Sequence, residues 1–256
     1  MDEEDYTIEL DYSGEKSLQQ RILVATPTTG LVRIEWVQGR YGQVVPVNWS
    51  TVNYIETIPG YYALNYLVAD AQNVICHVAL ERNFEWLLLW EHDTIAPYDS
   101  FIRLNDYIRA ADIPVVSGLY YNRGVPSEPL IFRGRGTGAF LDWKKGDKVW
   151  CDGVPTGFLL IHMSILREMA KEADTYTQKG VQMKRIFETP RRYMKYENGD
   201  VDTVQGTSDL DWCTRVMEGN YFEKAGWSEY QKMQYPFLVD TNIFCRHVNP
   251  DGEMFP

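Results

Sequence analysis

The stretch FEWLLLWEHDTI, residues 84–95, joins a strongly apolar run to three ionisable residues. The run FEWLLLW has the length and composition of a buried strand. Burying the side chains of Glu91, His92 and Asp93 without partners would be costly, so we expect the strand to end at a metal ion, a nucleotide or water. Side chains two residues apart on an extended chain point to the same side, so Glu91 and Asp93 can act together as hard oxygen donors.

Segments with the pattern of strands alternate with helix-like segments along the first half of the chain. The strand-like segments are RILVATPTTG (21–30), NYIETIPG (53–60), FEWLLLW (84–90) and IPVVSGLYY (113–121), and YTIEL (6–10) is a further short candidate. The helix-like segments are 31–37, ended by Gly39, then 61–82, with Leu64, Leu67, Val68 and Ala71 at helical spacing, and 98–112. This alternation predicts an α/β sandwich with mostly parallel strands in the first half of the chain. In such sheets ligands bind at the carboxyl ends of strands, so TPTTG and EHDT are expected to border a cleft.

The second half of the chain has a different pattern. Residues 149–172 predict a turn, a strand and a helix, and TSDLDWCTRVMEGN (207–220) begins another helix. FLVDTNIFCRHVNPDG (237–252) predicts a strand followed by an exposed tail. Residues 173–207 are polar with few periodic apolar positions, so we expect a loop-rich, mobile segment there.

Composition restricts the class of protein. The chain has 256 residues, 45% of them hydrophobic, which suffices for one large domain or two small ones. Its net charge of −11 argues against non-specific binding of nucleic acid. The sequence has no apolar run of membrane-spanning length, and its acidic start lacks the pattern of a secretory signal. Four well-separated cysteines without a CxxC pair favour reduced thiols, so we expect a soluble, cytoplasmic protein.

Four further motifs carry residues that are suited to chemistry. SDLDWCTR contains Asp209 and Asp211, which also suit the first turn of a helix because of the helix dipole. FCRHVN contains His247, and CDGVPTGFLLI contains Gly157, where the backbone can approach a ligand closely or form a tight turn. Arg123, in the segment after the strand at 113–121, could pair with phosphate.

In their order and spacing these motifs resemble those of the GT-A fold glycosyltransferases, especially the inverting family 2 group. EHD stands where that family has an aspartate-any-aspartate motif, with glutamate in place of the first aspartate. The resemblance implies that Asp93 and His247 are metal ligands, and that Glu91 approaches the metal or the ribose. SDLD resembles the start of the family's Glu-Asp-x-Asp helix, with serine in place of the glutamate. Asp209 would then be the general base, with Asp211 stabilising the helix or exchanging roles with it.

The resemblance also implies where the donor binds. Thr26, Pro27 and Thr28, which follow the first strand, would lie beside the base and ribose of the nucleotide. Glu91, His92, Arg123 and Gly157 complete the expected set of nucleotide-sugar-binding residues, although His92 is also expected to have a structural role.

The resemblance implies a single GT-A glycosyltransferase domain at 21–256, preceded by a peripheral acidic segment at 1–20. Its expected fold is a Rossmann-like α/β/α sandwich with a mixed, mostly parallel central sheet. Residues 21–119 would form the nucleotide-binding half and residues 120–256 the acceptor-binding half. The expected reaction moves a sugar from a UDP- or GDP-sugar to a hydroxyl acceptor with inversion, assisted by Mn²⁺ or Mg²⁺. Three alternatives stay open: a retaining transferase, a nucleotide-sugar-binding protein without turnover, and a sugar-1-phosphate nucleotidylyltransferase. TPTTGLVR lacks the glycine-rich loop that the last alternative needs.

Overall fold

The computed structural model describes residues 22–49, 61–134, 136, 138–195 and 201–256. The acidic segment at 1–20, with its candidate strand at 6–10, and the strand expected at 53–60 lie outside these residues. Within the described part of the chain, no helix has the length and apolar character needed to cross a bilayer.

A seven-stranded sheet forms the centre of the molecule, in the order β2-β1-β3-β7-β5-β12-β6. Its strands are β1 (Ile22–Thr28), β2 (Tyr61–Leu64), β3 (Trp86–Trp90), β5 (Val115–Leu119), β6 (Lys148–Cys151), β7 (Phe158–His162) and β12 (Phe237–Phe244). Strands β6 and β7 run antiparallel to their neighbours, and the other strands run in one direction. The predicted mixed, mostly parallel sheet is confirmed.

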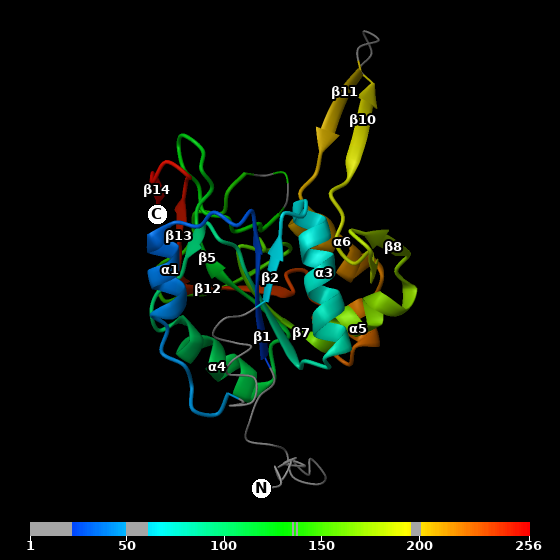
Figure 1. Ribbon diagram of the computed structural model, residues 1–256, viewed down its shortest axis with the longest axis horizontal. Coiled ribbons are helices and arrows are strands. Elements are labelled where there is room, and N and C mark those ends of the chain that lie inside the picture. Colours follow the sequence, from blue (N-terminus) through cyan, green and yellow to red (C-terminus); the bar gives the residue numbers. More distant parts are fainter. Residues whose placement is uncertain (1–21, 50–60, 135, 137, 196–200) are drawn as a thin grey trace, which may run out of the picture.

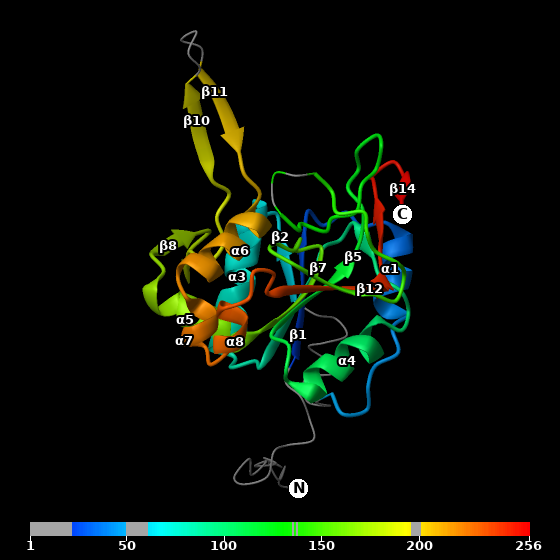
Figure 2. The ribbon, with the colours of Figure 1, turned by 180° about the vertical axis from the view of Figure 1, so that it is seen from behind.

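Helices cover both faces of this sheet (Figures 1 and 2). They are α1 (Ile34–Tyr41), α3 (Val68–Glu81), α4 (Ser100–Ala110), α5 (Met163–Glu172), α6 (Ser208–Glu218), α7 (Tyr221–Lys224) and α8 (Ser228–Gln231). Alternate residues of a strand face opposite sides, so Leu23 of β1 packs in the core beneath α3, α5 and α6, whereas Val24 packs in the core beneath α4. The α/β sandwich implied by the GT-A resemblance is therefore present.

The remaining strands form smaller sheets at the periphery. They are β4 (Thr94–Ile95), β8 (Thr175–Gln178), β9 (Val181–Lys184), β10 (Arg191–Lys195), β11 (Val201–Gln205), β13 (Arg246–Val248) and β14 (Met254–Phe255). β4, β13 and β14 form one sheet, while β8–β9 and β10–β11 are separate antiparallel pairs. The β10–β11 pair extends away from the rest of the molecule in both views (Figures 1 and 2).

Four local predictions were wrong. The helix expected over 61–82 begins only at Val68, because the preceding residues pair with β1 as an edge strand. α1 begins at Ile34 and continues past Gly39, whose missing side chain allows close packing: an added Cβ would lie 3.1 Å from Ile95 Cγ2. The segment at 173–207 is not loop-rich but holds two hairpins. The expected C-terminal tail instead forms β13 and β14 and buries Val248.

Candidate active site

The carboxyl ends of β1 and β3 lie side by side, because the two strands are parallel neighbours in the sheet. The segments that follow them therefore meet, as the sequence predicted. His92 Nδ1 lies 3.1 Å from the carbonyl oxygen of Pro27, which links the two strand ends directly. This contact gives His92 a structural role within the site.

Glu91 is held from several directions. Its backbone N–H donates to the carbonyl of Gly157 over 2.9 Å, and its own carbonyl accepts from the indole N–H of Trp36 over 2.9 Å. Its carboxyl accepts a hydrogen bond of 3.1 Å from Thr156 Oγ1. Burial raises the pKa of Glu91 to about 8, and the nearby charges of Asp93 and Asp209 act in the same direction. Glu91 is consequently mostly protonated at neutral pH.

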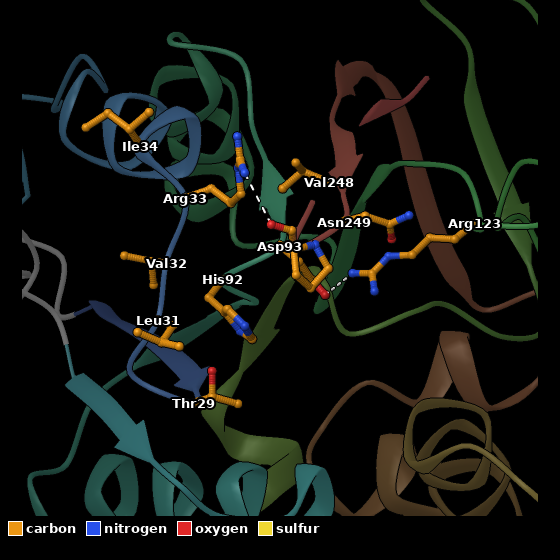
Figure 3. A pocket seen from close by; sticks show the side chains of 11 residues that line it. Thr29, Leu31, Val32, Arg33, Ile34, His92, Asp93, Arg123, Val248 and Asn249 are labelled. Carbon is orange, nitrogen blue, oxygen red and sulfur yellow. Dashed lines mark hydrogen bonds and ion pairs between the residues drawn. The ribbon is translucent and has the colours of Figure 1, made fainter. Parts of the chain in front are cut away.

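Asp93 and His247 converge on one position, which the guanidinium of Arg123 fills. Figure 3 shows the contact between Arg123 and Asp93. Asp93 Oδ2 lies 3.7 Å from His247 Nε2, and Arg123 Nη2 contacts both atoms. Burial would raise the pKa of Asp93, but its close approach to His247 and the charge of Arg123 outweigh it and hold this pKa below its usual value. The site thus contains one ionised carboxylate, Asp93, beside one protonated carboxyl, Glu91.

The orientation of His247 suits a metal ligand. Its Nδ1 lies 2.9 Å from the carbonyl oxygen of Tyr121, which can only accept, so Nδ1 carries a proton. In the neutral ring the lone pair is then on Nε2, the atom that faces Asp93. Metal-binding histidines are commonly oriented by such a bond to the other ring nitrogen.

A cavity of about 610 Å³ opens beside Asp93 (Figure 3). Its walls are formed by Thr29, Leu31, Val32, Arg33, Ile34, His92, Asp93, Arg123, Val248, Asn249 and Pro250. The β1–α1 connection supplies much of the apolar wall, and the ionic group of Asp93 and Arg123 lies at one side. A second cavity, of about 130 Å³, is lined by Pro27, Thr28, Thr29, Tyr66, Val68, Glu91, His92 and Asp93. His92 and Asp93 border both cavities.

Asp209 lies at the start of α6, where its carboxylate accepts the backbone N–H of Leu210 over 2.8 Å. Its charge contributes to the raised pKa of Glu91 and of Tyr120, which places it on the same side of the site as those groups. Asp211 also lies in the first turn of α6. Neither aspartate lines the two cavities described above.

Gly157 brings the backbone close to the site, and sequence reasoning missed its partners. The N–H of Gly157 donates to the hydroxyl of Tyr120 over 2.7 Å. A Cβ at position 157 would overlap that hydroxyl and would lie 2.9 Å from Thr94 Oγ1. Burial, followed by the charges of Glu91 and Asp209, raises the pKa of Tyr120 well above its usual value. The only signal for these contacts in the sequence was the turn PTG before an apolar strand.

The structure therefore brings most of the predicted site residues together. Pro27 and Thr28 line the smaller cavity, whereas Thr26 is buried within β1 and lines neither cavity. Asp93 and His247 form a pair, but among the described residues no group of three or more His, Cys, Asp or Glu side chains is arranged to hold a metal.

The donor chemistry of this pair nevertheless fits a divalent cation. A carboxylate oxygen and an imidazole nitrogen point at a position that a positive group already fills. The second oxygen of Asp93, Oδ1, is buried and has no hydrogen-bond partner among the described residues. Ligands beyond these two would have to come from a bound substrate or from water.

Comparisons with known proteins bear on the fold. No family model matches the chain, and no curated protein matches it. The structure of A197 from STIV is similar with a TM-score of 0.50 and 14% identity, over 92% of this chain and 93% of that chain. A glycosyltransferase involved in the glycosylation of the major capsid of PBCV-1 has a TM-score of 0.31 and 13% identity, over 58% of this chain and 62% of that chain. The first likeness shows a shared fold along nearly the whole chain, and the second is too weak to support an argument.

Proposed function

We propose that this protein is a glycosyltransferase that moves a sugar from a nucleoside-diphosphate sugar to a hydroxyl acceptor. One observation supports the proposal above all others. Side chains predicted from three separate motifs lie close together at the carboxyl edge of the sheet. Glu91 and Asp93 border the cavities, Asp93 Oδ2 lies 3.7 Å from His247 Nε2, and the charge of Asp209 acts on Glu91. A structural role for each residue alone would not require that they meet.

The two cavities suggest how a UDP- or GDP-sugar would lie. The nucleoside would occupy the smaller cavity, where Pro27 and Thr28 border it on one side and the ring of Tyr66 can support a base. The diphosphate would lie beside Asp93, which borders both cavities, and Arg123, which lines the larger one. An anionic diphosphate can bind near acidic residues only when positive charge lies between them.

We propose that Asp93 and His247 hold Mn²⁺ or Mg²⁺ during the reaction. The bound cation supplies positive charge that stabilises the departing diphosphate. Glu91 is less suited to bind the metal than Asp93 and His247 are, because its raised pKa keeps it protonated at neutral pH. In that form it can donate a hydrogen bond to a hydroxyl of the ribose or of the sugar.

Asp209 is the proposed general base of an inverting reaction. Its carboxylate accepts the proton of the acceptor hydroxyl while that oxygen bonds to the anomeric carbon. The bond between this carbon and the diphosphate oxygen breaks on the opposite face, and the nucleoside diphosphate leaves with the electron pair. Asp211 lies in the same helical turn and is the alternative base.

A screen for binding and turnover tests the proposal. UDP- and GDP-sugars are added with and without Mn²⁺, and the melting temperature and release of nucleoside diphosphate are measured. We expect at least one donor to stabilise the protein and to be consumed; binding at 100 times Kd would stabilise the fold by about 2.7 kcal/mol. Asp93→Asn should abolish the increase in donor binding and turnover that Mn²⁺ causes. Asp99→Asn, which removes the carboxylate of a surface ion pair with Arg103, should not. Binding without turnover under every condition would instead indicate a nucleotide-sugar-binding protein.

We also propose a cytoplasmic location, because the four cysteines are buried and form no disulfide bond within the described residues, as expected in a reducing compartment.

A further inference from the structure

We propose that Arg123 is a built-in cation that occupies the metal position until a diphosphate draws it away. Binding of metal and binding of nucleotide would then depend on each other through this one side chain. The inference rests on the proposed function, because it assigns the order of events at the same site.

The contacts of Arg123 are those that a cation would make. Its Nη2 atom donates to Asp93 Oδ2 and lies 3.0 Å from His247 Nε2. These are the two atoms that converge on the proposed metal position, 3.7 Å apart. A divalent ion and a guanidinium cannot share this position, because their charges repel and their contacts with the two ligand atoms coincide.

The two ligands are anchored, whereas the arginine is not held in the same way. His247 belongs to β13, which pairs with β4, and its ring packs edge-to-face on Tyr120 with ring centroids 5.3 Å apart. The backbone carbonyl of Asp93 accepts the N–H of Val248 over 2.8 Å. Arg123 lies in the connection between β5 and β6, is exposed, and is followed by Gly124.

The backbone around Arg123 is nevertheless fixed, so that the side chain stays at the cavity. The side chain of Asn122 accepts the backbone N–H groups of Gly124 and Glu128, each over 3.0 Å. Tyr121 and Pro129 form a bridge that closes this connection. Rotation of the Arg123 side chain alone can therefore exchange one anionic partner for another within the cavity that it lines.

A diphosphate would supply that second partner. Arginine binds phosphate oxygens through two parallel hydrogen bonds, so a diphosphate in the cavity competes well with Asp93 for the guanidinium. Once the arginine has moved, Asp93 Oδ2 and His247 Nε2 are available to the cation. Because coupling between two binding sites is reciprocal, metal would strengthen nucleotide binding by the same factor.

Binding of Mn²⁺, measured by electron paramagnetic resonance, tests this inference directly. The proteins compared are the wild type, Arg123→Met, Arg123→Lys and the control Arg103→Met, whose arginine pairs with Asp99 on α4. Each is titrated with Mn²⁺ alone and with UDP or GDP present, after correction for Mn²⁺ bound by free nucleotide. Circular dichroism verifies that each variant is folded.

We expect Arg123→Met to bind Mn²⁺ alone about tenfold more tightly than the wild type does, within the usual range of coupling. The nucleotide should raise the Mn²⁺ affinity of the wild type more than that of Arg123→Met. Arg123→Lys, which keeps the charge, and Arg103→Met should resemble the wild type. Equal Mn²⁺ affinity in wild type and Arg123→Met, or binding by neither, would overturn the inference.

Measuring turnover of a nucleotide sugar distinguishes a failure of this inference from a failure of the proposed function. A wild type that consumes a nucleotide sugar while Arg123→Met leaves Mn²⁺ affinity unchanged refutes only the role of Arg123. Tighter Mn²⁺ binding by Arg123→Met, in a protein that consumes no nucleotide sugar, supports the cation exchange and counts against sugar transfer.

Discussion

Replacing Glu91 with glutamine should change how the free energy of unfolding depends on pH. Burial, together with Asp93 and Asp209, raises the pKa of Glu91 from 4.5 to about 8 in the folded protein. Between these values the folded chain keeps a proton that the unfolded chain has lost. The stability that this proton contributes is full below pH 4.5 and disappears as the pH rises through 8.

The magnitude follows from the same two values. A difference of about 3.5 pH units at 1.36 kcal/mol each corresponds to about 5 kcal/mol. Glu91 is only partly buried and can recruit water when it ionises, so we expect about half of this, about 2–3 kcal/mol. Glutamine has no charge to bury, and its carbonyl oxygen can still accept the bond from Thr156.

Urea unfolding of the wild type and Glu91→Gln at pH 5, 7 and 9 measures this effect. The two proteins should differ by about 1 kcal/mol or less at pH 5, and the variant should be more stable by about 2–3 kcal/mol at pH 9. Glu218→Gln, at an exposed position on α6, controls for the loss of one charge. A difference that stays constant across this range, or a variant that is less stable at pH 9, would refute the reasoning.

Three further substitutions test other parts of the site and the fold. Gly157→Ala should weaken donor binding and lower the melting temperature, because its Cβ would overlap the hydroxyl of Tyr120; an unchanged variant would show that the close approach is not required. Asp209→Asn should lower kcat by about 10²–10⁴-fold with donor affinity nearly unchanged, whereas near-normal kcat with about 1 kcal/mol lost stability would reduce Asp209 to a helix-start residue. Tyr107→Phe removes the 2.7 Å hydrogen bond to buried Asp240 and should lower the free energy of unfolding in urea by about 1.5–3 kcal/mol. Donor binding should not change, and a change would contradict the assignment of this hydrogen bond to the core rather than to the site.

The sequence predicted the strand ends of the site for a simple physical reason. An apolar run that stops at Glu91 and Asp93 must leave the core at that point, and parallel neighbours bring such ends together. Arg123 was considered only as a partner for phosphate. Its contact with Asp93 and His247 joins residues 30 and 124 positions away along the chain, and no local pattern carries that information.

The hairpins of residues 173–207 were missed although the chain contained a signal for each. β8 and β9 are joined by Lys179 and Gly180, with φ of 49° and 80°, as expected for a two-residue hairpin turn. Asn198-Gly199 in the sequence is the corresponding signal between β10 and β11. Polar residues on these strands hid the alternation by which strands are usually predicted. We still predict that residues 173–207 are mobile in the free protein and become more ordered when a donor binds. Hydrogen exchange with and without UDP-sugar tests this, and slow exchange that the ligand does not change would count against it.

Release of nucleoside diphosphate from a panel of UDP- and GDP-sugars tests the central claim most directly. Each donor is incubated with the wild type, Asp93→Asn and the control Asp99→Asn, in Mn²⁺ and in chelator. We predict that the wild type and Asp99→Asn release nucleoside diphosphate from at least one donor in Mn²⁺, and that Asp93→Asn does not. Equal release by Asp93→Asn, or no release from any donor by the wild type with a broad set of hydroxyl acceptors, would contradict the account.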